Sequence, residues 1–166
     1  METLTLRNTA ARGFTLIELL VSTSIVAVLL TLAVPSFTDL ILNQHVRAGA
    51  GDLQTSLFFA RSEAIKRAAD VKVVPSGDDW KNGWSVQLTD GTVLRSEDPL
   101  NAQLDSISGT TVTYGSDGRI PPPALDTLVF RVAGNTHVTA RCIAVDLSGR
   151  PSLLSDTDRN PDNGCN

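Results

Sequence analysis

Apolar residues dominate the segment 14–34, in which Glu18 is the only charged side chain. At a rise of about 1.5 Å per residue, a helix of this length spans about 30 Å, the thickness of a bilayer's hydrocarbon core. A charged group inside such a span is costly, so it marks a functional residue by default. We therefore predict a membrane-spanning helix with a functional carboxylate near its N-terminal end. The alternative is an ordinary membrane anchor that tolerates one acid.

Beyond Pro35 the pattern becomes that of an amphipathic helix. Small and apolar residues recur at alternating spacings of four and three, at Val46, Ala50, Leu53, Leu57, Ala60 and Ala64. This spacing places them on one face, which we expect to pack on a globular domain. The helix is predicted to begin at Phe14, to reach about Ala69 and to be kinked near Pro35, because proline removes a backbone hydrogen bond. Charged residues near its end are interpreted as polar or domain-edge positions: Arg61, Glu63, Lys66 and Arg67.

Short segments rich in β-branched residues follow the helix. They predict strands at 71–75, 84–89, 92–95, 111–114, 127–132 and 137–146. Asp90-Gly91 is a strong hairpin signal between two of them. The pattern predicts an α+β fold, in which the long N-terminal helix packs on antiparallel sheets. The segment 148–166 is polar and is expected to form a tail.

Charge and cysteine content add three expectations. A formal net charge of −4 argues against bulk, nonspecific affinity for nucleic acid. Arg7 and Arg12 precede the apolar span, so the positive-inside tendency places the N-terminus in the cytoplasm and the residues after 35 outside. In an outward-facing domain Cys142 and Cys165 are expected to form a disulfide worth about 3 kcal/mol. Two unrelated buried thiols are the alternative.

The segment around the carboxylate, Arg12-Gly13-Phe14-Thr15-Leu16-Ile17-Glu18, resembles the class III signal of type IV prepilins and type II secretion pseudopilins. The resemblance implies that residues 1–13 are a leader, that a prepilin peptidase cuts between Gly13 and Phe14, and that the new amine of Phe14 is methylated. It also implies that Glu18 attracts the N-terminal amine of a neighbouring subunit during assembly. Residues 14–41 would then be the membrane and filament-core helix, and residues 42–166 a periplasmic globular pilin domain.

Two later segments, Phe59–Ala64 and Asp79–Trp84, resemble the FimT/FimU and GspH branch of minor pilins and pseudopilins. The resemblance implies a pilin-like fold and a minor type IV pilin, a structural subunit at or near the pilus tip that helps to initiate assembly for adhesion, twitching or DNA uptake. Such a protein is single-pass in the bacterial inner membrane and extracellular once assembled. Its partners are other major and minor pilins, the inner-membrane assembly platform and, before assembly, membrane lipid. A type II secretion pseudopilin of the H type is the alternative.

A third possibility within the resemblance is a DNA receptor in natural transformation. Family members implicated in DNA binding carry a Gly-Arg-x-Arg motif, in which two arginines face the phosphate backbone. This chain has Gly149-Arg150-Pro151-Ser152, so Ser152 replaces the second arginine. Arg141 and Arg159 would compensate if the fold brought them near Arg150. DNA is therefore a partner that the sequence does not favour.

The last motif places oxygen ligands at alternate positions, Asp156, Asp158, Asn160 and Asp162. Calcium loops have such spacing, but Pro161 stands where an EF-hand needs glycine. The alternative is a solvated loop whose side chains complete their own turns. No metal or other cofactor is expected. Catalysis is not expected either, because His45 and His137 have no partner nucleophile in an interpretable pattern, and no Walker or dinucleotide motif is present.

Overall fold

The computed structural model describes residues 13–107, 110–122, 127–160, 163 and 165. The chain divides into two compact units, of which one ends at Phe37 and the other begins at Thr38. A single long helix, α1 (Leu16–Arg67), contributes to both units. Its ends lie close to the expected ones, and its helical backbone continues through Pro35. The kink near Pro35 stays a prediction.

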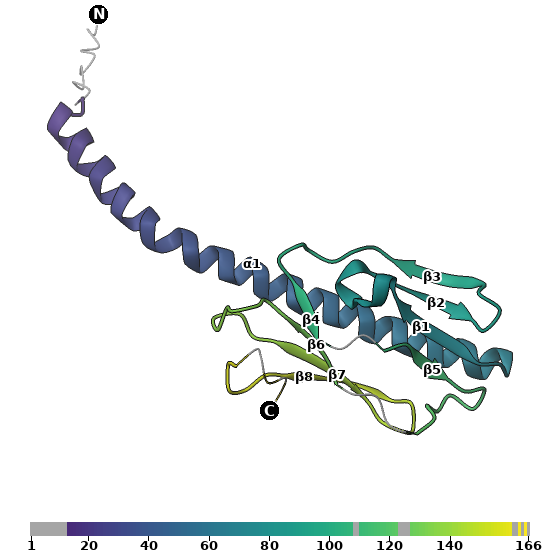
Figure 1. The fold of residues 1–166 in the computed structure, drawn as a ribbon. Coiled ribbons are helices and arrows are strands. Elements are labelled where there is room, and N and C mark those ends of the chain that lie inside the picture. Colours follow the sequence, from purple (N-terminus) through teal and green to yellow (C-terminus); the bar gives the residue numbers. More distant parts are fainter. Residues whose placement is uncertain (1–12, 108–109, 123–126, 161–162, 164, 166) are drawn as a thin grey trace, which may run out of the picture. The chain divides into compact units, whose positions relative to one another are not determined.

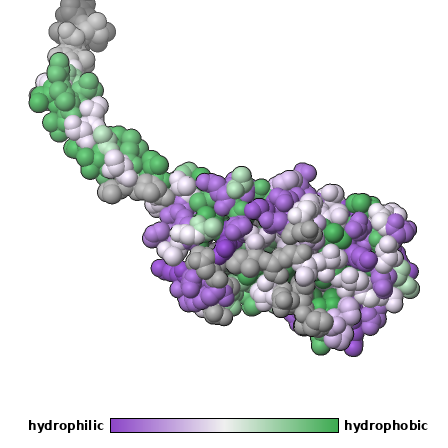
Figure 2. Space-filling view, in the orientation of Figure 1, coloured by the Kyte–Doolittle hydropathy of each residue, from purple (hydrophilic) through white to green (hydrophobic). Residues whose placement is uncertain are grey.

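In the N-terminal unit, every described side chain is exposed. Figure 2 shows hydrophobic residues over most of this segment, with few polar ones between them. The hydroxyl groups donate to helix carbonyls three or four residues earlier, at Ser22, Thr23, Ser24 and Thr31. Because these polar groups are satisfied within the helix, the segment meets the main requirement for a bilayer interior. By length and composition, α1 is long and apolar enough to cross a membrane.

The C-terminal unit contains two antiparallel four-stranded sheets beside α1 (Figure 1). The first has the order β3-β2-β1-β5, formed by β1 (Val71–Pro75), β2 (Trp84–Leu88), β3 (Val93–Glu97) and β5 (Val112–Tyr114). The second has the order β4-β6-β7-β8, formed by β4 (Asp105–Ile107), β6 (Leu128–Arg131), β7 (Arg141–Val145) and β8 (Pro151–Ser155). Two short 3-10 helices, η1 (Ser76–Asp78) and η2 (Trp80–Asn82), connect β1 to β2.

One hydrophobic core joins α1 to both sheets. The predicted helix stripe is confirmed, because all six residues from Val46 to Ala64 at those spacings are fully buried. Strand residues from the two sheets, including Tyr114 and Phe130, belong to the same core. Trp80 and Trp84 also lie in it, with ring centroids 6.2 Å apart. The α+β fold with a long helix on antiparallel sheets is therefore confirmed.

Three features of the second sheet differ from the prediction, and the first is β4 (Asp105–Ile107), a strand that the sequence pattern did not predict. The strand expected at 137–146 begins only at Arg141, because Asn135 Oδ1 accepts hydrogen bonds from the backbone N–H groups of His137 and Val138 and holds a turn there. The tail expected from residue 148 instead contains β8, which pairs with β7 in antiparallel register. Proline is tolerated at the first position of an edge strand, where Pro151 lies.

Candidate functional site

The N-terminal motif forms the start of α1. Thr15 immediately precedes the helix, and its Oγ1 accepts a hydrogen bond of 3.3 Å from the backbone N–H of Glu18. Thr15 is therefore the N-cap, and Thr-x-x-Glu is the pattern of a capping box. The Glu18 carboxylate lies in the first turn, where the helix dipole favours a negative charge. The role of Thr15 was missed, although its spacing from Glu18 was a sufficient signal.

The expected cleavage bond lies just outside the helix. Gly13 and Phe14 have no helical assignment, and the Phe14 side chain is 79% exposed. A Cβ added to Gly13 would meet no atom within 4 Å. Exposed backbone outside regular secondary structure is where proteolytic cleavage concentrates. The leader residues 1–12 lie outside the described part of the chain, and cleavage and methylation remain predictions.

The disulfide between Cys142 and Cys165 is confirmed, with Cα atoms 6.0 Å apart. Cys142 lies on β7 and is fully buried. It forms a second, small apolar cluster with Val129 and Ala140, against which Cys165 packs. The disulfide therefore ties the end of the chain to the second sheet.

The Gly149–Ser152 motif lies in the turn between β7 and β8 and at the start of β8. Gly149 has a φ of +78°, and a Cβ there would lie 2.0 Å from the carbonyl oxygen of Gly118. Arg61 of α1 holds the two turns together, because its Nε donates to the Gly118 carbonyl at 3.0 Å and an Nη donates to the Ser148 carbonyl at 3.0 Å. Gly149 is thus explained by packing. The role of Arg61 was missed because both of its partners are backbone carbonyls, which leave no signal in the sequence.

The structure does not bring the three candidate DNA-binding arginines together. The β7–β8 register pairs Arg141 with Ser155, at the opposite end of the hairpin from Arg150, and Arg159 follows the Ser155 end. Beside Arg150, the Asp146 carboxylate accepts its backbone N–H at 3.0 Å. Hydrogen bonds from the Ser148 hydroxyl and from this N–H lower the pKa of Asp146, so a negative charge persists there. The condition for compensation by Arg141 and Arg159, that they lie near Arg150, is therefore not met.

The described members of the acidic motif complete their own turns. Asp156 accepts from the N–H of Asp158 at 3.2 Å, and Asp158 accepts from the N–H of Asn160 at 2.8 Å and from the amide of Asn163 at 2.7 Å. Burial, together with its contact to Asp158, raises the pKa of Asp156. Among the described residues, no group of three or more His, Cys, Asp or Glu could hold a metal ion. Asp162 lies outside the described residues, and the solvated-loop interpretation accounts for the others.

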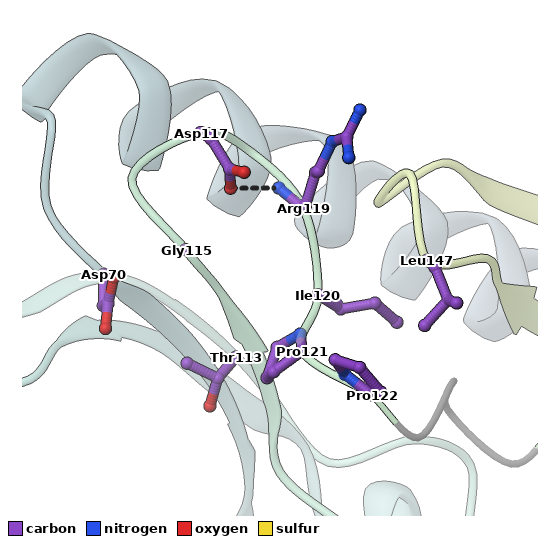
Figure 3. Close-up of a pocket in the computed structure, with 9 residues that line it drawn as sticks. All are labelled: Asp70, Thr113, Gly115, Asp117, Arg119, Ile120, Pro121, Pro122 and Leu147. Carbon is purple, nitrogen blue, oxygen red and sulfur yellow. Dashed lines mark hydrogen bonds between the residues drawn. The ribbon is translucent and has the colours of Figure 1, made fainter.

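A surface pocket of about 480 Å³ lies between the β5–β6 connection and the β7–β8 turn (Figure 3). Asp70 and Thr113 lie on one side of it, and Ile120 and Leu147 lie on the other. Asp117 accepts the backbone N–H of Arg119 at 3.0 Å and so closes its own turn. The lining residues include no histidine or cysteine, and no two of them form a nucleophile–base pair. The pocket therefore has no recognisable catalytic arrangement.

Comparison with known proteins agrees with this geometry. The family described as type II transport protein GspH matches residues 49–149, and the prokaryotic N-terminal methylation motif matches residues 8–34. A crystal structure of the type IV minor pilin FimU of Pseudomonas aeruginosa has a TM-score of 0.59 at 23% identity, covering 74% of this chain and 96% of that chain. A second crystal form of FimU has a TM-score of 0.56 at 23% identity, covering 72% and 99%. No curated protein matches with significance. The chain thus belongs to the GspH family of type IV minor pilins and pseudopilins, and it has the fold of FimU.

Proposed function

We propose that this chain is a minor type IV pilin, a structural subunit that helps to initiate pilus assembly at or near the tip. One observation carries the proposal. Glu18 is the only charge in an apolar segment whose described side chains are all exposed, and it lies within an N-terminal methylation motif. An apolar surface of this extent requires lipid before assembly and the helices of other subunits afterwards.

Before assembly, the segment 14–34 spans the bacterial inner membrane. Arg7 and Arg12 keep the leader in the cytoplasm, and the domain from residue 42 onward lies in the periplasm. The prepilin peptidase cuts between Gly13 and Phe14 and methylates the new amine. The exposed position of Phe14 and the non-helical backbone before α1 support this step.

During assembly, the Glu18 carboxylate meets the N-terminal amine of a neighbouring pilin. In surroundings of low dielectric constant an isolated carboxylate is strongly unfavourable, and an ammonium partner offsets much of that cost. The pair therefore favours one register between adjacent helices over others. Major pilins, other minor pilins and the assembly platform of the inner membrane are the partners in this step.

Two variants of Glu18 separate its charge from its position in the capping box. Glu18→Gln keeps a side chain that can complete the capping box but removes the charge. Glu18→Ala removes both the charge and the capping side chain. Both variants should be cleaved normally and should be depleted from sheared pili in an immunoblot. The control is Ser24→Ala, because the Ser24 hydroxyl donates to the Leu20 carbonyl of its own helix. Normal incorporation of Glu18→Gln would contradict the charge-pairing role.

A type II secretion pseudopilin of the H type is the second candidate, and the description of the matching family favours it. Both functions use the same membrane segment and the same Glu18 contact. Purification of the tagged chain from cross-linked membranes distinguishes them by the major subunit that is recovered with it. Recovery of a type II secretion major pseudopilin, without major pilin, would replace the first proposal by the second.

The DNA-receptor alternative has less support, because Arg150 lies beside Asp146 and far along the hairpin from Arg141. It is tested by measuring the affinity of the full chain for double-stranded DNA at two salt concentrations. A salt-dependent affinity that Arg150→Ala weakens would revive this alternative. We expect no difference between Arg150→Ala and the unchanged chain.

A further inference from the structure

Within the C-terminal unit, the face of α1 opposite the buried stripe carries no charged side chain. Eight residues at alternating spacings of three and four form this free face: Ile41, Gln44, Ala48, Gly51, Thr55, Phe58, Ser62 and Ile65. Seven of them are exposed, and Gly51 is half-buried. Charged residues normally occupy the outward face of a helix that covers a globular domain. Their absence over about 36 Å of helix indicates that another molecule covers the free face.

The spacing of the free face is the heptad repeat of a coiled coil. Intervals of three and four average 3.5 residues, so the side chains stay on the side that faces a second, supercoiled helix. Ile41, Phe58 and Ile65 supply large apolar side chains that are 42%, 46% and 52% exposed. Ala48 and Gly51 lie between them and let a second helix approach closely, because the side chains at the contact set the distance between helix axes. The free face therefore fits an α-helix.

The polar residues of the free face can be buried in such a contact. The Thr55 hydroxyl donates to the Gly51 carbonyl at 2.9 Å, and the Ser62 hydroxyl donates to the Phe59 carbonyl at 2.7 Å. Both hydroxyl groups therefore keep a hydrogen-bond partner when water is removed. The Gln44 amide contains both donors and an acceptor, so two copies of it can bond each other across a symmetric contact. One buried amide of this kind sets the register of a coiled coil.

The charged residues that border the free face are complementary to themselves. In a parallel coiled coil, the g position of one helix faces the e position of the next heptad on the other helix. With Ile41 at an a position, Arg47 is at g and Asp52 is at the next e. Both are exposed, and neither forms an ion pair within the described part of the chain. Burial and the nearby Glu97, itself paired with Arg95, raise the pKa of Asp52, and an added guanidinium offsets this cost of ionisation.

The other facing g and e positions add little repulsion. Two of these pairs are uncharged when histidine is neutral: Leu40–His45 and Gln54–Phe59. The last pair, Arg61 and Lys66, consists of two cations. However, the Arg61 guanidinium is held by two carbonyls of its own domain, and Lys66 Nζ lies 3.3 Å from a carboxylate oxygen of Glu63. The border of the free face therefore favours a parallel pair of identical helices.

We propose that, before assembly, the free face binds the free face of a second copy of the same chain in a parallel, two-fold symmetric coiled coil. This inference rests on the proposed anchoring in the inner membrane, because two copies inserted in the same direction have parallel α1 helices. The two domains lie on opposite sides of the helix pair, since the free face is opposite the buried stripe. During assembly, helices of other subunits replace the second copy.

Cysteine cross-linking tests the contact. Helix axes about 8–10 Å apart, with Cα atoms about 2.3 Å from each axis, bring facing Cα atoms within the range that a disulfide spans. The described chain has no free cysteine, so Ala48→Cys adds a single thiol. Mild oxidation of the full chain in membrane vesicles should give a covalent dimer of Ala48→Cys. The matched control, Ala133→Cys, is exposed in a turn between β6 and β7 and should stay monomeric.

Two further measurements identify the occupant of the free face and separate this proposal from the membrane anchoring. Photo-cross-linking from benzoylphenylalanine in place of Phe58, read by mass, should link two copies of the chain. A different pilin as the only cross-linked product would overturn the proposal. Carbonate extraction of the same vesicles shows whether the chain is anchored. Absence of Ala48→Cys dimers in anchored chain overturns the dimer and leaves the proposed function intact, whereas release by carbonate contradicts the anchoring on which both rest.

Charge reversal tests the complementarity of the border. Arg47→Asp and Asp52→Arg should each weaken dimerisation about two- to tenfold in sedimentation equilibrium in detergent, with less effect at high salt. The double variant should recover the affinity of the unchanged chain, because the pair forms again with its charges exchanged. A double variant that dimerises no better than the single variants would overturn the proposed register.

A charge within the free face tests the apolar contact. Phe58→Asp should weaken dimerisation by about tenfold or more, because it places a carboxylate between the helices. The control is Leu154→Asp, since Leu154 on β8 is exposed to a similar extent, 44%, but lies outside the free face. Circular dichroism of each variant confirms that the domain is folded. Equal dimerisation of the two variants would overturn the proposal.

Discussion

Replacement of Gly149 by alanine should destabilise the domain far more than the loss of glycine alone. Gly149 has a φ of +78°, and a left-handed backbone costs a residue with a Cβ about 1–2 kcal/mol. In addition, the new Cβ would lie 2.0 Å from the Gly118 carbonyl oxygen, a backbone atom that cannot rotate away. Forced repacking of this kind costs about 1–3 kcal/mol. The sum is about 3 kcal/mol, or a fall in the unfolding midpoint of about 10 °C.

The control for this experiment is Gly134→Ala. Gly134 also has a positive φ, +69°, but no atom lies within 4 Å of its Cβ position. It therefore carries the conformational cost without the close contact. Thermal unfolding of the full chain in detergent, followed by circular dichroism, should give the larger shift for Gly149→Ala. Equal shifts for the two variants would refute the close approach of the two turns as the reason for Gly149.

Three other changes probe the domain. Arg61→Ala removes both hydrogen bonds to the turn carbonyls and should lower the unfolding free energy by about 2 kcal/mol in denaturant titration, whereas the exposed Arg47→Ala should change it little. Reduction of the Cys142–Cys165 disulfide should cost about 3 kcal/mol, and an unchanged midpoint would contradict its role. The hydrogen bond from Arg67 lowers the pKa of Glu63 below its ordinary value of 4.5. The ionised Glu63 therefore stabilises the folded domain above pH 4.5, and this stabilisation is lost as the pH falls through the pKa of Glu63 in the folded state. In Glu63→Gln the unfolding free energy should fall less steeply as the pH is lowered below 4.5. An unchanged pH dependence in this variant would contradict the stabilising role of Glu63.

Features that leave a local pattern in the sequence could be predicted from it. The buried face of α1 follows from spacings of three and four, because each helical turn returns a side chain to the same side. The hairpin at Asp90-Gly91 and the disulfide likewise follow from local turn chemistry and from a pair of cysteines. The apolar segment 14–34 could also be predicted, because its length and its single carboxylate, Glu18, can be read directly from the sequence.

Features that depend on distant partners could not be predicted. Arg61 bonds carbonyls that lie 57 and 87 residues away, and any residue can supply a carbonyl. β8 could not be predicted, because polar and apolar residues do not alternate in the short run after Pro151. Only the pairing with β7 makes this run a strand. The separation of Arg141 from Arg150 depends on the hairpin register, which composition does not determine.

The intact mass of the chain recovered from sheared filaments shows whether this chain is a processed filament subunit. We expect the chain in the filament fraction, beginning at N-methylated Phe14, with residues 1–13 removed. If the chain is cut after Gly13, Gly13→Arg should abolish both the shorter mass and the filament signal, because a bulky charged side chain would then stand beside the bond to be cut. A chain that keeps residues 1–13 and stays in the membrane fraction under piliated conditions would show that it is not a processed pilin subunit.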